Sequence, residues 1–142
     1  MTIDPLRDAK PFALWPAVPP SIQAIMPNVT WDRARLARLD LPLRDIPVAS
    51  LRWQLDLPWW RNGDRVFAVT PNQVRNAPEH FVVQWRRTLD SDLDWPIHLL
   101  DRGRLVLLDG VHRLLKADVL EMRTISARVL DVSRFSEVLV RG

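Results

Sequence analysis

The residues best placed to do chemistry lie in one short stretch, Asp109-Gly110-Val111-His112-Arg113, with Lys116 a turn further on. Three basic or potentially basic side chains therefore flank the predicted first turn of a helix. The first amides of a helix have no internal hydrogen-bond partner and carry the positive end of the helix dipole. The stretch predicts a site for an anion, typically a phosphate. Its expected ligands are Gly110, Val111, His112, Arg113 and Lys116.

Asp109 and His112 are the candidate catalytic residues within this stretch. A carboxylate at Asp109 could act as a base or hold a metal ion, or it could simply cap the helix N-terminus. His112 is either structural or an oxyanion ligand, and a bound anion would favour its charged form.

A metal ligand is predicted in the acidic run Asp90-Ser91-Asp92-Leu93-Asp94. The run opens like a calcium loop but lacks the glycine and the distant glutamate of an EF-hand. It is either a charged helix end or, through Asp94, a site for Mg²⁺ that bridges the phosphates of a nucleoside triphosphate.

The elements that must position the anion site can be read from the hydrophobic pattern. The continuous apolar run Leu105–Leu108 predicts a buried strand, and Asp109 is expected to be the N-cap of the following helix. Val111, Leu114, Leu115 and Val119 form one face of that helix. The β-branched, alternating segment Thr124–Leu130 predicts a returning strand.

This strand–turn–helix segment resembles the motif of the ParB/sulfiredoxin-like domains. Asp94-Trp95-Pro96-Ile97-His98-Leu99-Leu100 is similar to the Pro-Ile strand that precedes the motif, and Ile46–Leu51 is similar to the opening strand. The resemblance covers about residues 45–130. It implies a single α/β (α+β) domain with a small mixed sheet flanked by helices, and a helix end that binds nucleotide phosphates.

The resemblance also limits the chemistry. Sulfiredoxins have a catalytic cysteine directly before the His-Arg pair, where this chain has Val111, and the chain has no cysteine. The chromosome-partitioning members have Glu-Arg-Arg and a later helix-turn-helix domain, so centromere binding is not expected. In the family the helical stretch 70–90 faces the nucleotide, which makes Gln73, Arg75 and His80 further candidate ligands.

Length and composition predict one globular domain. The chain has 142 residues, of which 47% are hydrophobic and 26% charged, and a net charge of +3. Its 20 basic residues are 18 arginines and 2 lysines, a bias that suits phosphate recognition and is also what a compositionally biased genome would produce. No membrane span or signal peptide is visible, and the absence of cysteine fits a reducing compartment, so the expected location is cytoplasmic.

Residues 1–29 are expected to form a proline-rich arm, and residues 30–142 the domain itself. Apolar anchors such as Phe12, Trp15 and Ile22 predict that the arm packs on its own domain or on a neighbouring subunit.

Further elements are predicted from caps and turns. We expect a helix over Trp31–Leu39 capped by Thr30, a strand over Ile46–Trp53, and a turn at Asn62-Gly63 before a strand at Arg65–Val69. Thr70-Pro71 should begin a helix, and Glu79–Leu89 should form another, with Phe81, Val82, Trp85 and Leu89 on one apolar stripe. Residues 131–140 form a closing helix or strand.

Three functions are compatible with these features. The first is a nucleotide-dependent enzyme that carries out phosphoryl transfer or phosphate-ester hydrolysis. The second is a non-catalytic module that senses a nucleotide, or binds a protein or a second copy through the Pro/Trp-rich region. The third is DNA binding through Arg33, Arg35 and Arg38. Trp59 and Trp60 are expected in the core or an interface, with base stacking as the alternative.

Overall fold

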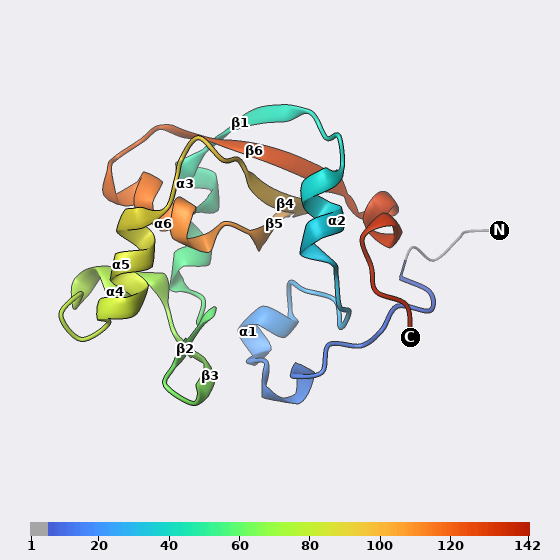
Figure 1. Ribbon diagram of the computed structural model, residues 1–142, viewed down its shortest axis with the longest axis horizontal. Coiled ribbons are helices and arrows are strands. Elements are labelled where there is room, and N and C mark those ends of the chain that lie inside the picture. The colour runs from blue at the N-terminus through green and yellow to red at the C-terminus, as the bar shows by residue number, and fades with distance from the viewer. Residues whose placement is uncertain (1–5) are drawn as a thin grey trace.

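A computed structural model describes residues 6–142 and shows an α/β domain built on a mixed four-stranded sheet (Figure 1). The strand order is β1-β6-β4-β5, where β6 is antiparallel to β1 and parallel to β4, and β5 is antiparallel to β4. A separate hairpin pairs β2 with β3. The strands are β1 Leu43–Pro47, β2 Trp60–Asn62, β3 Arg65–Val69, β4 Ile97–Asp101, β5 Leu105–Asp109 and β6 Thr124–Asp131. The predicted α/β class with a small mixed sheet is confirmed.

Short helices occupy the connections between the strands. The α-helices are α1 Pro20–Gln23, α2 Arg33–Arg38, α3 Val48–Leu51, α4 Pro71–Asn76, α5 Val82–Asp90 and α6 Val111–Val119. The 3₁₀ helices are η1 Trp15–Ala17, η2 Arg52–Asp56 and η3 Val132–Glu137. Within residues 6–142, no helix has both the length and the apolar character needed to cross a membrane.

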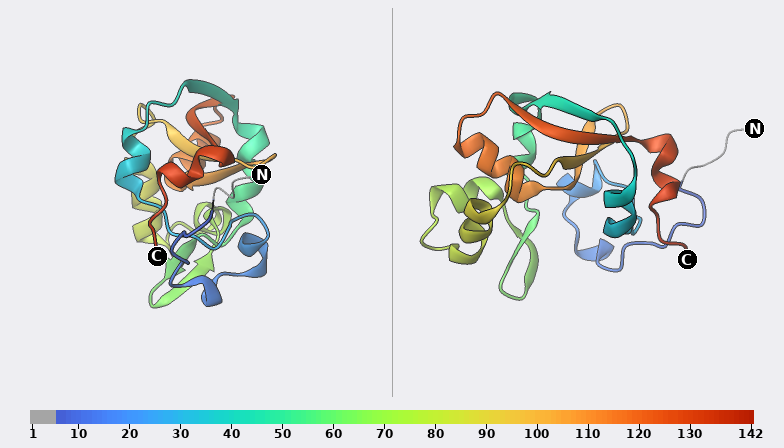
Figure 2. Two further views of the ribbon diagram at one scale, coloured as in Figure 1. Left: turned by 90° about the vertical axis from the view of Figure 1, so that its right-hand side faces the viewer. Right: turned by 45° about the horizontal axis from the view of Figure 1, so that its top comes forward.

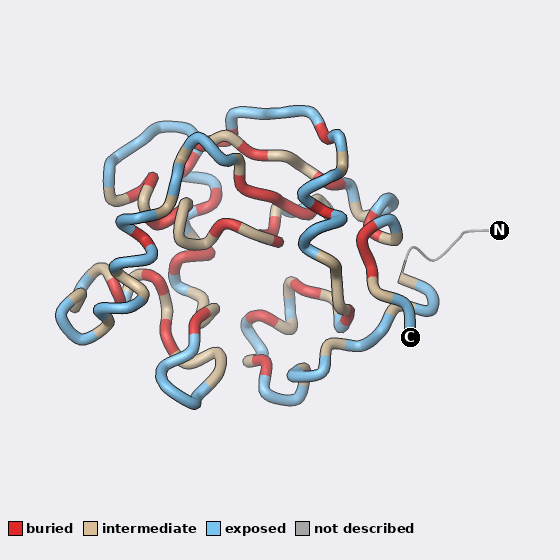
Figure 3. Tube along the Cα trace, viewed as in Figure 1, coloured by how far each residue is buried: buried red, intermediate tan, exposed pale blue. Residues whose placement is uncertain are grey.

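Strands β4, β5 and β6 are covered on both faces because their residues alternate between two hydrophobic clusters. Ile97, Leu99 and Leu107 pack with α6 and α3, and this cluster also contains Leu114 and Leu115. On the opposite face, residues of the same strands pack with η3 and the N-terminal segment; they are Leu100, Val106, Leu108 and Leu130. Figure 3 shows the buried residues gathered along these strands, with exposed residues at the hairpin tip and in the loops.

The N-terminal segment is part of this second cluster. Val18, Ile22, Met26 and Val29 are buried against the sheet, so residues 6–29 pack on their own domain. The Lys10 amide also donates to the carbonyl of Val140, near the C-terminus, and the Lys10 carbonyl accepts from the Thr30 amide. In both views of Figure 2 the segment lies across the molecule from β1 and β6, close to the C-terminal end.

Most elements around the predicted anion site form where the sequence placed them. The strand at 105–108, the helix from Val111, the strand from Thr124 and the turn at Asn62-Gly63 are all present. The helix α4 begins with a capping box in which Thr70 and Gln73 bond each other's backbone amides.

Other boundaries were predicted wrongly. The strand expected over Ile46–Trp53 ends at Pro47, and Val48 begins α3, because the apolar residues that follow pack as helical turns in the core. The cap of α2 is Asp32, whose carboxylate accepts from two amides, whereas the Thr30 hydroxyl donates to the Pro11 carbonyl.

The helix predicted to start at Glu79 starts at Val82 instead. The expected apolar stripe is therefore divided: Phe81 and Trp85 pack on the core, while Val82 and Leu89 are exposed. The closing segment forms η3, a 3₁₀ helix.

Candidate functional site

The junction between β5 and α6 can accommodate only glycine at position 110. Gly110 is the N-cap of α6 and has φ 112° and ψ 26°, a left-handed conformation. A Cβ atom there would lie 2.5 Å from Cγ2 of Ile97. No side chain caps the helix, so its first-turn amides are left for water or a ligand.

Asp109 is not the N-cap that the sequence predicted. It is the last residue of β5, and its Oδ2 accepts a hydrogen bond from Nη2 of Arg113 at 3.0 Å. Nη1 of the same guanidinium donates to the Pro96 carbonyl at 2.8 Å. The Asp109 carboxylate therefore bonds to this arginine, one helical turn away, and Gly110 is the N-cap residue of α6.

His112 is held by two residues that are distant in sequence. Its ring stacks on Trp60 with centroids 4.4 Å apart, and its Nε2 lies 2.8 Å from Oε1 of Gln84. Burial first, and then the charges of Arg87 and Arg113, lower the pKa of His112 to about 4. The ring is therefore neutral near pH 7 and donates Nε2–H to Gln84, so at position 112 the backbone amide rather than a cationic ring is available to an anion.

Lys116 also has a partner that the sequence did not indicate. Its Nζ donates to the carbonyls of Leu89 at 2.8 Å and Ser91 at 2.7 Å, at the C-terminal end of α5. A cation there satisfies helix-end carbonyls and complements the dipole. Lys116 does not line the cavity described next.

The N-terminus of α6 opens into a cavity of about 690 Å³. Gly110, Val111, His112 and Arg113 line it at the helix end, and Ala37 of α2 lines it from across the sheet edge. Figure 1 shows α2 and α6 on either side of the ends of β4 and β5. Further charged and aromatic residues contribute to its wall: Arg87, Asp92, Trp95, Asp109 and Arg128.

Three polar residues on neighbouring strands line this cavity, and we call them the polar row: Asp109, His98 and Arg128. His98 of β4 is in register with Arg128 of β6 and with Asp109 of β5. His98 is 8% exposed, and both of its ring nitrogens are buried without a hydrogen-bond partner in residues 6–142. Such a group is unusual, because buried polar atoms are almost always paired.

The predicted metal ligand Asp94 is not among the residues that line the cavity. Asp92 does line it, and the Asp92 carboxylate accepts a hydrogen bond from the Asp94 amide in a local turn. No group of three or more histidine, aspartate or glutamate side chains suited to a metal ion occurs in the described part of the chain.

The candidate ligands of residues 70–90 lie elsewhere. Gln73 belongs to the α4 capping box, and the His80 side chain is largely exposed beside Glu79. Arg75 pairs with the buried carboxylate of Asp118, which also accepts from Arg52 at 2.8 Å.

Trp59 and Trp60 pack in or against the hydrophobic core, which confirms the prediction made for them. Trp60 is buried under His112, and Trp59 packs on both hydrophobic clusters while its Nε1 donates to the Gln54 carbonyl. The aromatic residue that is open to a ligand is Trp95, which is 68% exposed at the cavity.

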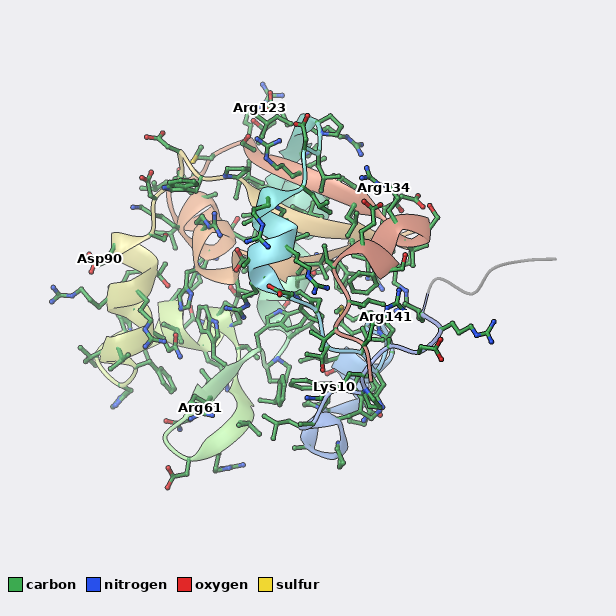
Figure 4. The ribbon with its side chains drawn as sticks, turned by 45° about the vertical axis from the view of Figure 1, so that its right-hand side comes forward. Lys10, Arg61, Asp90, Arg123, Arg134 and Arg141 are labelled. Carbon is green, nitrogen blue, oxygen red and sulfur yellow. The ribbon has the colours of Figure 1, made fainter. Side chains whose placement is uncertain are left out.

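Arginines outside this cavity lie on several parts of the molecule. Arg61, Arg123 and Arg134 lie on separate parts of the molecular outline (Figure 4). In α2, Arg35 is engaged by Asp32 and by the Leu139 carbonyl. DNA binding and a protein-interaction role stay predictions of the sequence.

Comparisons of the chain with protein-family models, with curated proteins and with solved structures found no match in any of the three. The resemblance to ParB/sulfiredoxin-like domains therefore stays a prediction, and functional inference rests on the geometry of the cavity.

Proposed function

We propose that this protein binds a phosphate-bearing ligand of the nucleotide class in the cavity at the N-terminus of α6. The observation that carries the proposal is the convergence of an uncapped helix N-terminus and three arginines, Arg87, Arg113 and Arg128, on one cavity. Backbone amides and the helix dipole favour an anion at such an end, and guanidinium groups are well matched to phosphate oxygens.

The three arginines contribute differently. Arg113 is fixed by Asp109 and the Pro96 carbonyl, and Arg128 donates to the Leu41 carbonyl, so both supply positive charge from a set position. Arg87 has no hydrogen bond or ion pair within residues 6–142, which leaves its five N–H donors available to a ligand. We assign the direct phosphate contact to Arg87 and the first-turn amides.

The nucleoside portion of the ligand has a matching surface. Trp95 presents an exposed indole at the cavity, and a base could stack on it. The cavity volume of about 690 Å³ falls in the range of roughly 300–1,000 Å³ that small-molecule sites occupy. These features support a nucleotide over a free inorganic anion.

Phosphate-ester hydrolysis or phosphoryl transfer is the second candidate function, and Asp109 is the observation that favours it. Its side chain is 36% exposed at the cavity, and only Oδ2 is engaged by Arg113. Oδ1 could accept a proton from an attacking hydroxyl or water, or contact Mg²⁺ carried by a nucleoside triphosphate.

A thermal-shift panel tests the binding proposal. ATP, CTP, GTP and pyrophosphate are added with and without Mg²⁺ to the wild-type protein, to Arg87→Ala and to Arg86→Ala. Arg86 precedes Arg87 on α5 but does not line the cavity, so it is a matched control. A ligand at a hundred times its Kd stabilises a protein by about 2.7 kcal/mol, which corresponds to roughly 5–15 °C in Tm.

We expect a nucleotide to raise the Tm of the wild type and of Arg86→Ala, and to have a much smaller effect on Arg87→Ala. Release of a hydrolysis or transfer product in the same samples would show that the protein turns the nucleotide over as well as binding it. An equal shift in all three proteins, or none with any of the four ligands at millimolar concentration, would refute the assignment.

A further inference from the structure

We infer that His98 is a buried anion-binding group of this cavity and takes up a proton when a doubly charged phosphate binds. The inference deepens the proposed function and rests on it. It identifies the ligand class as one with a terminal phosphate, such as a phosphomonoester, in preference to a singly charged phosphodiester.

The His98 ring has no hydrogen-bond partner within residues 6–142. A neutral imidazole has one N–H donor and one acceptor nitrogen, and a charged one has two donors. Both nitrogens of His98 are buried and unpaired in the described chain, while the residue lines the cavity. A ligand oxygen in the cavity would satisfy a donor that the protein leaves unpaired.

The register of the sheet determines which charged residues are the neighbours of His98. Asp109 on β5 and Arg128 on β6 are the direct cross-strand neighbours of His98. In a regular ladder, residues paired in this way project from the same face of a sheet. A register shift interrupts the pairing of β4 with β5 next to His98, but Asp109, like His98 and Arg128, lines the cavity. The other charged or titratable groups at the cavity come from the helices and the loop after α5; they are Arg113 and His112 of α6, Arg87 of α5, and Asp92.

Burial and the nearby charges together set the protonation state of the His98 ring. Burial is the main cause that lowers the pKa of His98 below its usual value of 6.5, and Arg113 and Arg128 lower it further against the opposing effect of Asp109. His98 is therefore neutral near pH 7 when the cavity is empty. A phosphate dianion brings two negative charges and several acceptor oxygens, which favour the protonated ring.

The affinity for the anion should depend on pH because protonation of His98 and binding of the anion are linked equilibria. The bound state holds one more proton than the free state wherever the pH lies between the free and bound pKa values of His98. That interval begins below 6.5, and within it the affinity for a dianion falls as the pH rises, by up to about tenfold per pH unit.

The experiment is an NMR titration of the histidine rings with inorganic sulfate, which is a dianion across the range from about pH 5 to pH 8. The chain has only three histidines, and His98→Asn and His112→Asn assign the ring signals of two of them. His80, which is exposed and does not line the cavity, is the internal reference. Amide shifts of α6 report sulfate binding in the same samples.

We expect sulfate to shift the α6 amides, to raise the pKa of His98 and to leave His80 unchanged. We also expect the pH dependence of sulfate affinity to disappear in His98→Asn. Amide shifts in α6 without a change at His98 would overturn this inference and leave the proposed site intact. No response at α6 at any pH in this range would overturn the site itself, and the inference with it.

Discussion

Gly110→Ala should be among the most damaging substitutions of a small residue in this protein. The new Cβ would lie 2.5 Å from Cγ2 and 2.9 Å from Cβ of Ile97, which is fully buried in the core. Overpacking of this kind costs about 1–3 kcal/mol. Holding alanine at φ 112° costs a further 1–3 kcal/mol or so, since L-residues rarely adopt that conformation.

The expected loss is therefore about 2–6 kcal/mol in the free energy of unfolding, or roughly 5–25 °C in Tm. Urea denaturation monitored by tryptophan fluorescence measures it. Gly103→Ala is the matched control: its φ is +84°, but a Cβ there would meet nothing within 4 Å. It should lose only the backbone contribution, about 1–3 kcal/mol.

The difference between the two variants isolates the contact with Ile97. If Gly110→Ala is no less stable than Gly103→Ala, then α6 can shift away from the sheet at little cost. The reasoning that places the first-turn amides rigidly at the cavity would then be refuted.

Three further predictions concern charges around the helices. Lys116→Met should lower stability by about 1–3 kcal/mol because the two carbonyls at the end of α5 lose a charged donor, while Lys10→Met should have little effect on Tm. Asp118→Asn should destabilise the fold at neutral pH. Burial raises the pKa of Asp118, but Arg52 and Arg75 together outweigh it and lower the pKa below 3.8. This contribution to stability is therefore present above 3.8 and is lost as the pH falls through the lower folded-state pKa. Denaturation at several pH values should show a weaker acid dependence in the variant. Arg87→Gln should raise the pKa of His112 above about 4, measured by NMR titration, and an unchanged value would mean that burial and the other charges set it without Arg87.

The fold could be predicted best where local patterns and tertiary packing agree. The segment from Leu105 to Leu130 changes from a continuous apolar run to a 3.6-residue period and back to alternation, and it forms β5, α6 and β6. Ile46–Trp53 was misread because its apolar run is short, and such a run suits a strand or a buried helix equally well. Pro47 marks the change, since Val48 begins α3.

The site was only partly predictable, for a physical reason. Gly110 and Arg113 are only three positions apart along the chain, and local sequence was enough to place them at one helix end. The neutral state of His112 depends on burial and on the charge of Arg87, and the ring is held by Trp60 and Gln84. These residues reach His112 only through the tertiary fold.

The polar row was not visible in the sequence. It depends on the strand order β6-β4-β5, and the register places His98 between Arg128 and Asp109. One signal was available: His98 interrupts an otherwise apolar strand, where a polar residue calls for a partner.

The most direct test of the proposed function is a backbone amide NMR titration with the nucleotide that gives the largest thermal shift. We predict saturable shifts that are largest at Val111, His112 and Arg113, with smaller changes at the Trp95 indole. Shifts that centre instead on the separate cavity lined by Arg52, Arg75 and Arg123, or that grow linearly without saturation, would contradict a phosphate site at the N-terminus of α6.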